Sequence, residues 1–237
     1  MAAASRLTPS RVATAGIGEF GLEVAERVAK SENGSLVTFD ALENALVHGV
    51  MGIAAMWRPC PDLCERLDEL AFQAGTPWLP IVMEHPRIRV GPWGAAPGGP
   101  CYRCYCWRRR QHDTQPQVTR ALEAAYGAST AGGPTGYLPH HVTLAVGLAR
   151  LSLREQATSG MEGAADRVLW VNVVTGRPAM HRVIPSHGCT RCRPDDRLGG
   201  RLSLSEVTAS LAHRRPGGHG ICGDDRSGED RALGVAH

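Results

Sequence analysis

The chain has 237 residues, of which 43% are hydrophobic, and a formal net charge of +3. This length suits one ordinary domain with a core, and so small a charge gives no reason to expect nucleic-acid binding. No apolar run reaches the ~18 residues of a membrane span, and the N-terminus is too short and too weakly apolar for a signal peptide. We therefore expect a cytoplasmic protein that binds neither nucleic acid nor membranes.

Strand-like and helix-like segments alternate along the first half of the chain. An apolar strand candidate at 11–15 is followed at 22–30 by apolar residues at helical spacing. Further strands are expected at 35–39, 49–57, 78–83 and 87–92, and an amphipathic helix at 62–74. This alternation predicts a Rossmann-like three-layer α/β domain on a parallel sheet.

A glycine-rich turn joins the first strand to the first helix. Gly16, Gly18 and Gly21 form a Gly-x-Gly-x-x-Gly pattern, with which nucleotide-binding folds hold a phosphate at a helix N-terminus. The alternative, that the glycines only make the turn, stays open. Asp40 has the spacing of a ribose-binding acid, but we favour a role for it as the N-cap of a helix through Leu46.

Two Cys-x-x-Cys pairs, Cys101 with Cys104 and Cys189 with Cys192, are the strongest signal in the sequence. Glycine and proline residues flank both pairs, so we expect each on a turn, where four thiolates can converge on one tetrahedral ion. We predict a structural Zn²⁺ bound by these four residues. A redox dithiol or a disulfide is the alternative, but a redox pair would not need a second, matching pair. Cys106 is a rival ligand, although the one-residue spacer between it and Cys104 suits tetrahedral chelation less well.

The second half of the chain adds a basic run, two helices and a hairpin. The basic run, Arg108, Arg109, Arg110 and His112, is either a solvated helix surface or a binding surface for an acidic partner. Helices are expected at 117–126 and 141–156, and strands at 167–174 and 180–184 form a hairpin that leads to the second cysteine pair.

The domain boundaries follow from where the apolar pattern begins and fades. We predict a flexible N-terminus at 1–10, one domain with zinc knuckles and a hairpin extension at 11–195, and a disordered tail at 196–237. Within the tail, residues 202–211 could form a short helix.

Together these pieces resemble the ThiF-like fold of ubiquitin-activating-type enzymes. The resemblance rests on the glycine turn, on Val-Gly-Pro-Trp at 90–93 leading to the first cysteine pair, and on the hairpin before the second pair. It spans about residues 10–195. It is strongest to the zinc-binding ThiF-like partner proteins of YcaO cyclodehydratases in thiazole/oxazole-modified (microcin and thiopeptide) peptide biosynthesis. It implies a scaffold that presents a ribosomal precursor peptide, with a typically acidic leader, to a YcaO enzyme that forms azolines and azoles.

The chain also departs from the adenylating members of that superfamily. Those enzymes place cationic side chains around the triphosphate, where charge builds during attack, whereas Lys30 is the only lysine here and ends the first helix. Cys222 lies in the tail, and Cys60 and Cys64 have no evident base. We therefore expect no catalytic residue and little or no ATP binding. Many relatives bind the leader with an N-terminal winged helix of roughly 70–80 residues. Only about ten residues precede the first strand here, so we expect this element to be absent or to be supplied by another protein.

Two other functions stay open at this point. One is an adenylating enzyme that activates the C-terminal carboxylate of a peptide or a sulfur carrier. The other is a dinucleotide-dependent oxidoreductase, suggested by the glycine turn and Asp40 alone. Because ThiF-like domains commonly pair, helix 141–156 predicts a homodimer interface, with packing on its own sheet as the alternative.

Overall fold

The structure is a computed structural model that describes residues 12–96, 98–128, 132–134 and 136–192. The predicted N-terminal segment at 1–10, the tail at 196–237 and the helix at 202–211 within it lie outside the described residues.

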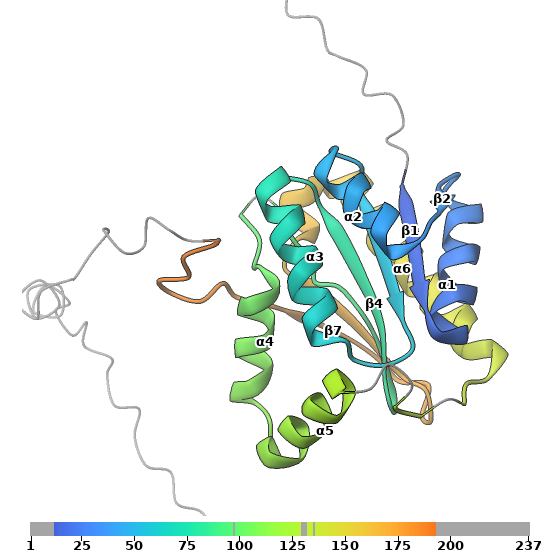
Figure 1. The fold of residues 1–237 in the computed structure, drawn as a ribbon, viewed down its shortest axis with the longest axis vertical. Helices are drawn as coiled ribbons and strands as arrows, with labels where there is room; N and C mark the ends of the chain where they lie inside the picture. The colour runs from blue at the N-terminus through green and yellow to red at the C-terminus, as the bar shows by residue number, and fades with distance from the viewer. Residues whose placement is uncertain (1–11, 97, 129–131, 135, 193–237) are drawn as a thin grey trace, which may run out of the picture. The chain divides into compact units, whose positions relative to one another are not determined.

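A seven-stranded sheet with the order β2-β1-β3-β4-β5-β6-β7 forms the centre of the domain (Figure 1). Neighbouring strands are parallel from β2 to β4 and antiparallel from β4 to β7. The strands are β1 (Ala13–Ile17), β2 (Ser35–Leu36), β3 (Gly52–Met56), β4 (Trp78–Glu84), β5 (Arg87–Val90), β6 (Arg167–Asn172) and β7 (Pro178–Arg182).

The predicted Rossmann-like α/β class is confirmed, and so is the β6–β7 hairpin. The sheet is mixed rather than parallel throughout, because only His85 and Pro86 separate β4 from β5. So short a connection reverses the chain, whereas parallel neighbours need a crossover of a dozen residues or more.

Helices cover both faces of the sheet and produce the three layers. The helices are α1 (Gly18–Ser31), α2 (Phe39–Val47), α3 (Pro61–Ala74), α4 (Tyr102–Gln111), α5 (Pro116–Ala128) and α6 (Pro139–Ala164). One core contains α1, α6 and the β3 residues Ile53 and Ala55, and the other contains α2, α3, α4 and the β3 residues Ala54 and Met56. This alternation follows from the two-residue period of a strand.

The segment after β2 differs from its prediction. Strand pairing ends at Leu36, and α2 begins at Phe39. The N-cap is Thr38, whose Oγ1 accepts a hydrogen bond from the Ala41 amide at 3.3 Å. The prediction of Asp40 as the N-cap was therefore wrong: Asp40 lies in the first turn, where its charge favours the positive end of the helix.

The long helix α6 begins two residues earlier than predicted and continues to Ala164, with a kink at Gly160. Its apolar residues Val142, Ala145 and Ala149 are buried in the core with α1 and the sheet. This is the packing named as the alternative to a dimer interface, and the homodimer stays a prediction.

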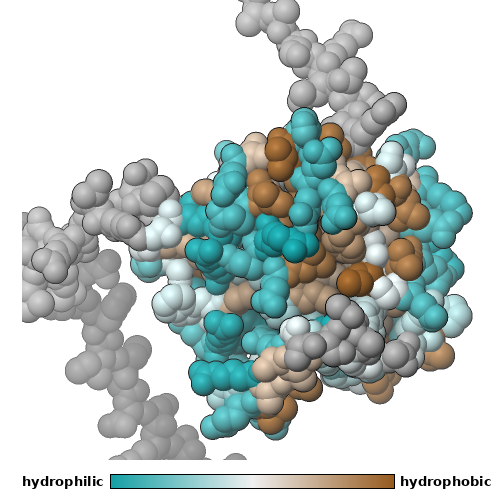
Figure 2. Space-filling model, viewed as in Figure 1, coloured by the Kyte–Doolittle hydropathy of each residue, from teal (hydrophilic) through white to brown (hydrophobic). Residues whose placement is uncertain are grey.

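Among the described residues no helix is long and apolar enough to cross a membrane. Hydrophilic side chains dominate the surface over α3 (Figure 2).

Candidate metal centre

The four predicted cysteines converge at one point. The Sγ atoms of Cys101 and Cys189 lie 3.6 Å apart, those of Cys104 and Cys192 lie 3.4 Å apart, and all four lie within 4.8 Å of one another. Sulfurs bound at ~2.3 Å around a tetrahedral ion lie ~3.8 Å apart. The cluster could therefore hold a metal ion such as zinc. The four cysteines are free thiols rather than disulfides, and Cys106 is not among the clustered ligands.

Two different local structures bring the sulfurs together. The second pair lies on turns, as expected, and Gly188 with φ +67° opens that segment. The first pair does not lie on a simple turn: Cys101 is the N-cap of α4, and Cys104 lies in its first turn. The dipole at a helix N-terminus favours a thiolate, so this placement is compatible with metal ligation.

The electrostatics of the cluster also favour a thiolate. The pKa of Cys104 lies well below its usual range, because Cys101, then Cys192 and the backbone N–H of Ser186 donate hydrogen bonds to its sulfur. The pKa of Cys101 is raised in turn, first because its thiol is the donor to Cys104. At least one ligand is thus ready to bind a cation, and a metal would displace the protons that the others retain.

A buried carboxylate, which the sequence analysis did not identify, links the two cysteine pairs. Asp68 of α3 is 0% exposed and accepts hydrogen bonds from Trp78 Nε1 at 3.1 Å, from the Tyr102 amide at 3.0 Å and from the Arg191 guanidinium at 2.6 Å. Tyr102 directly follows Cys101, and Arg191 lies between Cys189 and Cys192. Burial raises the pKa of Asp68, but all three partners only donate and therefore favour the carboxylate.

Two further acids of α3 complete this contact. Glu65 accepts from Arg191 at 3.0 Å and from Arg103 at 2.5 Å, and Glu69 also pairs with both arginines. Each cysteine pair therefore contributes the arginine of its own Cys-x-x-Cys spacer to one acidic face of α3. The sequence did offer a signal for this contact. Glu65, Asp68 and Glu69 have the i, i+3 and i+4 spacing that places them on one side of a helix, and Asp68 lies next to the apolar stripe of that helix.

In the described part of the chain, burial disfavours the thiolate form of the other three cysteines. Burial raises the pKa of Cys64 to about 12, and burial also raises the pKa values of Cys60 and Cys106. A thiol is a poor nucleophile in this protonated state. Cys222 lies outside the described residues.

The three glycines lie at the junction of β1 and α1, as predicted: Gly16 is in β1, Gly18 begins α1 and Gly21 follows in the helix. Gly16 packs on Gly21 so closely that a Cβ on Gly16 would lie 2.3 Å from the carbonyl oxygen of Gly21. Gly18 has φ +72°, and a Cβ there would lie 2.2 Å from Cδ1 of Trp57. The packing of Gly16 on Gly21 and of Gly18 against the Trp57 indole is therefore enough to require glycine at these positions. Asp40, the candidate ribose ligand, lies on α2.

The basic run divides into two half-buried arginines and two exposed residues. Arg108 donates to the carbonyl oxygens of Ile184 and Pro185, at 3.1 and 3.4 Å. Arg109 pairs with Glu123 at 2.7 Å and with Glu84 at 3.5 Å. Arg110 and His112 remain exposed at the end of α4.

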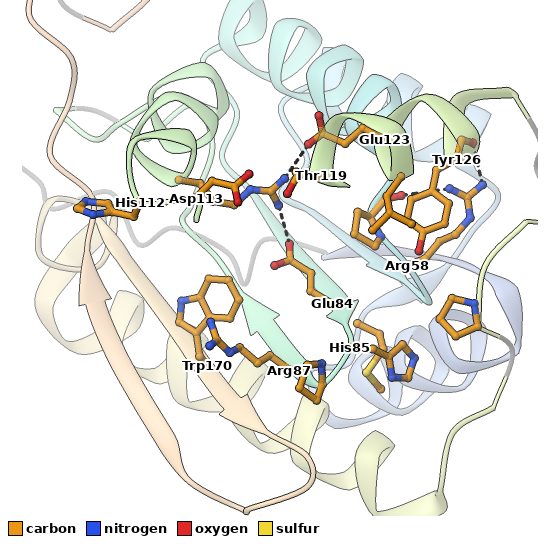
Figure 3. A pocket seen from close by; sticks show the side chains of 16 residues that line it. Arg58, Glu84, His85, Arg87, His112, Asp113, Thr119, Glu123, Tyr126 and Trp170 are labelled. Atoms are coloured by element: carbon orange, nitrogen blue, oxygen red, sulfur yellow. Dashed lines mark hydrogen bonds and ion pairs between the residues drawn. The ribbon is translucent and has the colours of Figure 1, made fainter. Parts of the chain in front are cut away.

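A cavity of about 460 Å³ lies beside this run (Figure 3). The ion pairs of Arg109 cross one of its walls, between α5 and the end of β4. Arg58, held by the Tyr126 carbonyl at 3.1 Å, lines another part, and Arg87 lies 5.7 Å from the centre of the Trp170 ring. The cavity combines apolar walls with three arginines, of which Arg109 is paired with two carboxylates.

Comparison with known proteins gives matches in structure alone. No family model and no curated protein sequence matches the chain. The heterocyclase TruD shares 12% identity over 85% of this chain and 32% of its own, with a TM-score of 0.55. A chain of the E. coli microcin synthetase McbBCD complex shares 12% identity over 79% of this chain and 71% of its own, with a TM-score of 0.52.

A third neighbour is E. coli MccB in a structure with ATP, at 11% identity over 77% of this chain and 67% of its own, with a TM-score of 0.52. The chain thus spans about a third of the length of TruD. At such identities the likeness establishes the fold, and it agrees with the fold that the resemblance in sequence implied.

Proposed function

We propose that this protein is a zinc-stabilised, non-catalytic partner that presents a ribosomal precursor peptide to a YcaO-type cyclodehydratase. The observation that carries the proposal is a four-cysteine cluster on a fold whose solved neighbours include a heterocyclase and a microcin synthetase chain. The YcaO enzyme would use the ATP. Its reaction joins a Cys, Ser or Thr side chain to the preceding backbone carbonyl and releases water.

The zinc would act as a structural ion. Four thiolates complete a tetrahedral site and leave no position open for water or substrate. The ligands are joined through Asp68 to α3, so the ion would fix the end of the β6–β7 hairpin segment against α3 and α4. A metal that joins segments so distant in the chain contributes directly to folding stability.

Two features support a role without adenylation. The Trp57 indole packs against Gly18, the first residue of α1, and the N-terminus of this helix is where a phosphate would bind. Lys30 lies in the last turn of α1 and pairs with Glu26 at 2.9 Å, at the opposite end of the helix from that turn. Phosphoryl chemistry needs cations beside the phosphates, so both features favour a partner that leaves ATP to the cyclodehydratase.

The basic run supports contact with an acidic peptide or with an acidic face of the partner enzyme. Arg110 and His112 are exposed, and Arg108 and Arg109 hold the surrounding backbone and acids in place. Replacing the three arginines by glutamine should weaken binding of the precursor or of the enzyme, measured separately. Arg66→Gln, on the exposed face of α3, is the matched control. If both affinities stay within about twofold, or ~0.4 kcal/mol, recognition lies elsewhere.

Reconstitution tests the function itself. A precursor peptide and its cyclodehydratase are incubated with ATP, with and without this protein, and heterocycles are counted by mass spectrometry as lost water. We expect heterocycle formation to depend on this protein. The Lys30→Ala variant should remain fully active, because Lys30 lies far from the glycine turn. Heterocycle formation at the same rate without the protein would refute the proposal.

A solved structure of the neighbour MccB contains ATP, and this favours one alternative for the present chain, an enzyme that adenylates a carboxylate. ATP–pyrophosphate exchange separates the two functions. Peptide-dependent exchange by the purified protein would establish the adenylating enzyme, and its absence together with active reconstitution supports the partner role.

A further inference from the structure

Strand β7 forms one edge of the sheet (Figure 1). All five of its residues are exposed, and within the described part of the chain only β6 pairs with it. Proteins usually protect such an edge, because its open N–H and C=O groups are a template for another strand.

The register identifies which backbone groups the edge presents. Asn172 donates to the Arg177 carbonyl at 3.0 Å, and Val183 donates to the Asp166 carbonyl at 2.7 Å. Hydrogen-bonded positions alternate along an antiparallel pair, so Ala179 also turns its N–H and C=O toward β6. Met180 and Arg182, between these positions, direct their backbone groups outward.

The edge is held in a defined conformation and carries apolar side chains. Arg108 donates to the Ile184 and Pro185 carbonyls just after β7, and this fixes the end of the strand. Met180 is 55% exposed and Ile184 is 67% exposed. Both side chains lie at alternate positions, where they could contact the side chains of an added strand.

The charge of the hairpin selects the kind of strand that would pair there. Residues 167–189 include three arginines and two histidines but no aspartate or glutamate. Arg182 pairs with Asp166 at 2.8 Å but remains largely exposed. A second copy of this edge would bring the same arginines together, so an acidic chain fits better than self-pairing.

We infer that β7 is a docking strand for an extended acidic peptide, which pairs with the outward backbone groups of Met180 and Arg182. Strand addition of this kind draws affinity from main-chain hydrogen bonds and selectivity from alternate side chains. The inference rests on the proposed function and deepens it, because it assigns a place where an acidic segment of the precursor binds.

The test uses fluorescence anisotropy with the full-length, zinc-loaded protein. The probe is a fluorescein-labelled peptide of about ten residues in which glutamate alternates with valine. Met180→Pro removes the outward N–H without touching a bond to β6, and proline is tolerated at an edge. Met180→Ala is the matched control, since it shortens the side chain and keeps the N–H.

We expect Met180→Pro to weaken binding about tenfold and Met180→Ala to weaken it less than about threefold, with equal thermal midpoints for the two variants. Replacing Arg177 and Arg182 by glutamine should weaken binding and reduce its salt dependence. A version of the probe with alternate amides N-methylated should bind poorly, and this control does not depend on the folding of any variant.

Several results would overturn the inference. The first is equal affinity of Met180→Pro and Met180→Ala for the probe. The second is that the N-methylated probe or a lysine–valine peptide binds as tightly as the glutamate–valine probe. The third is that the unmodified protein shows no saturable binding. A concentration-dependent dimer that Met180→Pro abolishes would assign the edge to a second copy instead.

The reconstitution assay separates this inference from the proposed function. If heterocycle formation requires the protein but Met180→Pro supports it as well as Met180→Ala does, the function stands and the docking strand fails. If the protein has no effect on heterocycle formation, the proposed function fails whatever the peptide-binding result.

Discussion

Asp68→Asn should weaken the link between the two cysteine pairs. The carboxylate is fully buried and accepts from three donors, one of which is the guanidinium of Arg191. Asparagine offers one acceptor oxygen and turns an amide N–H₂ toward donors that Asp68 now satisfies. The change also leaves Arg191, whose side chain is 4% exposed, with less compensating charge.

The magnitude follows from these contacts. Removing one partner of a buried ion pair costs about 3–5 kcal/mol. Glu65 and Glu69 still pair with Arg191, so we expect the lower end of that range, about 3 kcal/mol. For a domain of this size this corresponds to a fall of roughly 6–12 °C in Tm. Because Asp68 orients the backbone beside Cys101 and the spacer between Cys189 and Cys192, zinc affinity should fall about 10–100-fold.

Thermal unfolding and competition with a chromophoric zinc chelator measure the two effects. Glu69→Gln is the control, since Glu69 pairs with the same arginine but is more exposed. A Tm within about 2 °C of the unmodified protein, together with unchanged zinc affinity, would refute the role given to Asp68.

The other predictions concern the metal, the nucleotide and the assembly. Cys189→Ser should lower the bound zinc below one ion per chain and should lower the Tm, because metal binding and folding are coupled. If elemental analysis finds that this variant retains all its zinc, tetrahedral thiolate ligation is contradicted. Zinc should be released as the pH falls, because protons then compete with the metal for the four thiolate sulfurs. If a zinc-responsive dye detects no release down to about pH 4, cysteine ligation is excluded. ATP should bind weakly or not at all in calorimetry, since Trp57 covers Gly18, and a dissociation constant in the low micromolar range would show the reverse. Light scattering at micromolar concentrations tests the predicted homodimer, and a measured mass equal to that of a monomer would contradict it.

The sequence by itself determined the features that depend on neighbouring residues. Apolar runs and helical spacing predict most of the strands and helices, and the glycine turn between β1 and α1 was predicted from three glycines. The paired Cys-x-x-Cys motifs, with glycine and proline beside them, predict which four sulfurs converge. These features are encoded locally, because each follows from backbone conformation or from the spacing of a few residues.

Only the tertiary structure decided which distant groups meet. It placed Asp68 between Tyr102 and Arg191, which lie far apart in the chain, and it placed Trp57 over Gly18. It also divided a uniform run of arginines into the half-buried, ion-paired Arg109 and the largely exposed Arg110. Such contacts depend on how helices pack on the sheet, which hydrophobic periodicity does not specify. A buried charge is stable only when these distant partners surround it, so its role becomes visible only after the chain has folded.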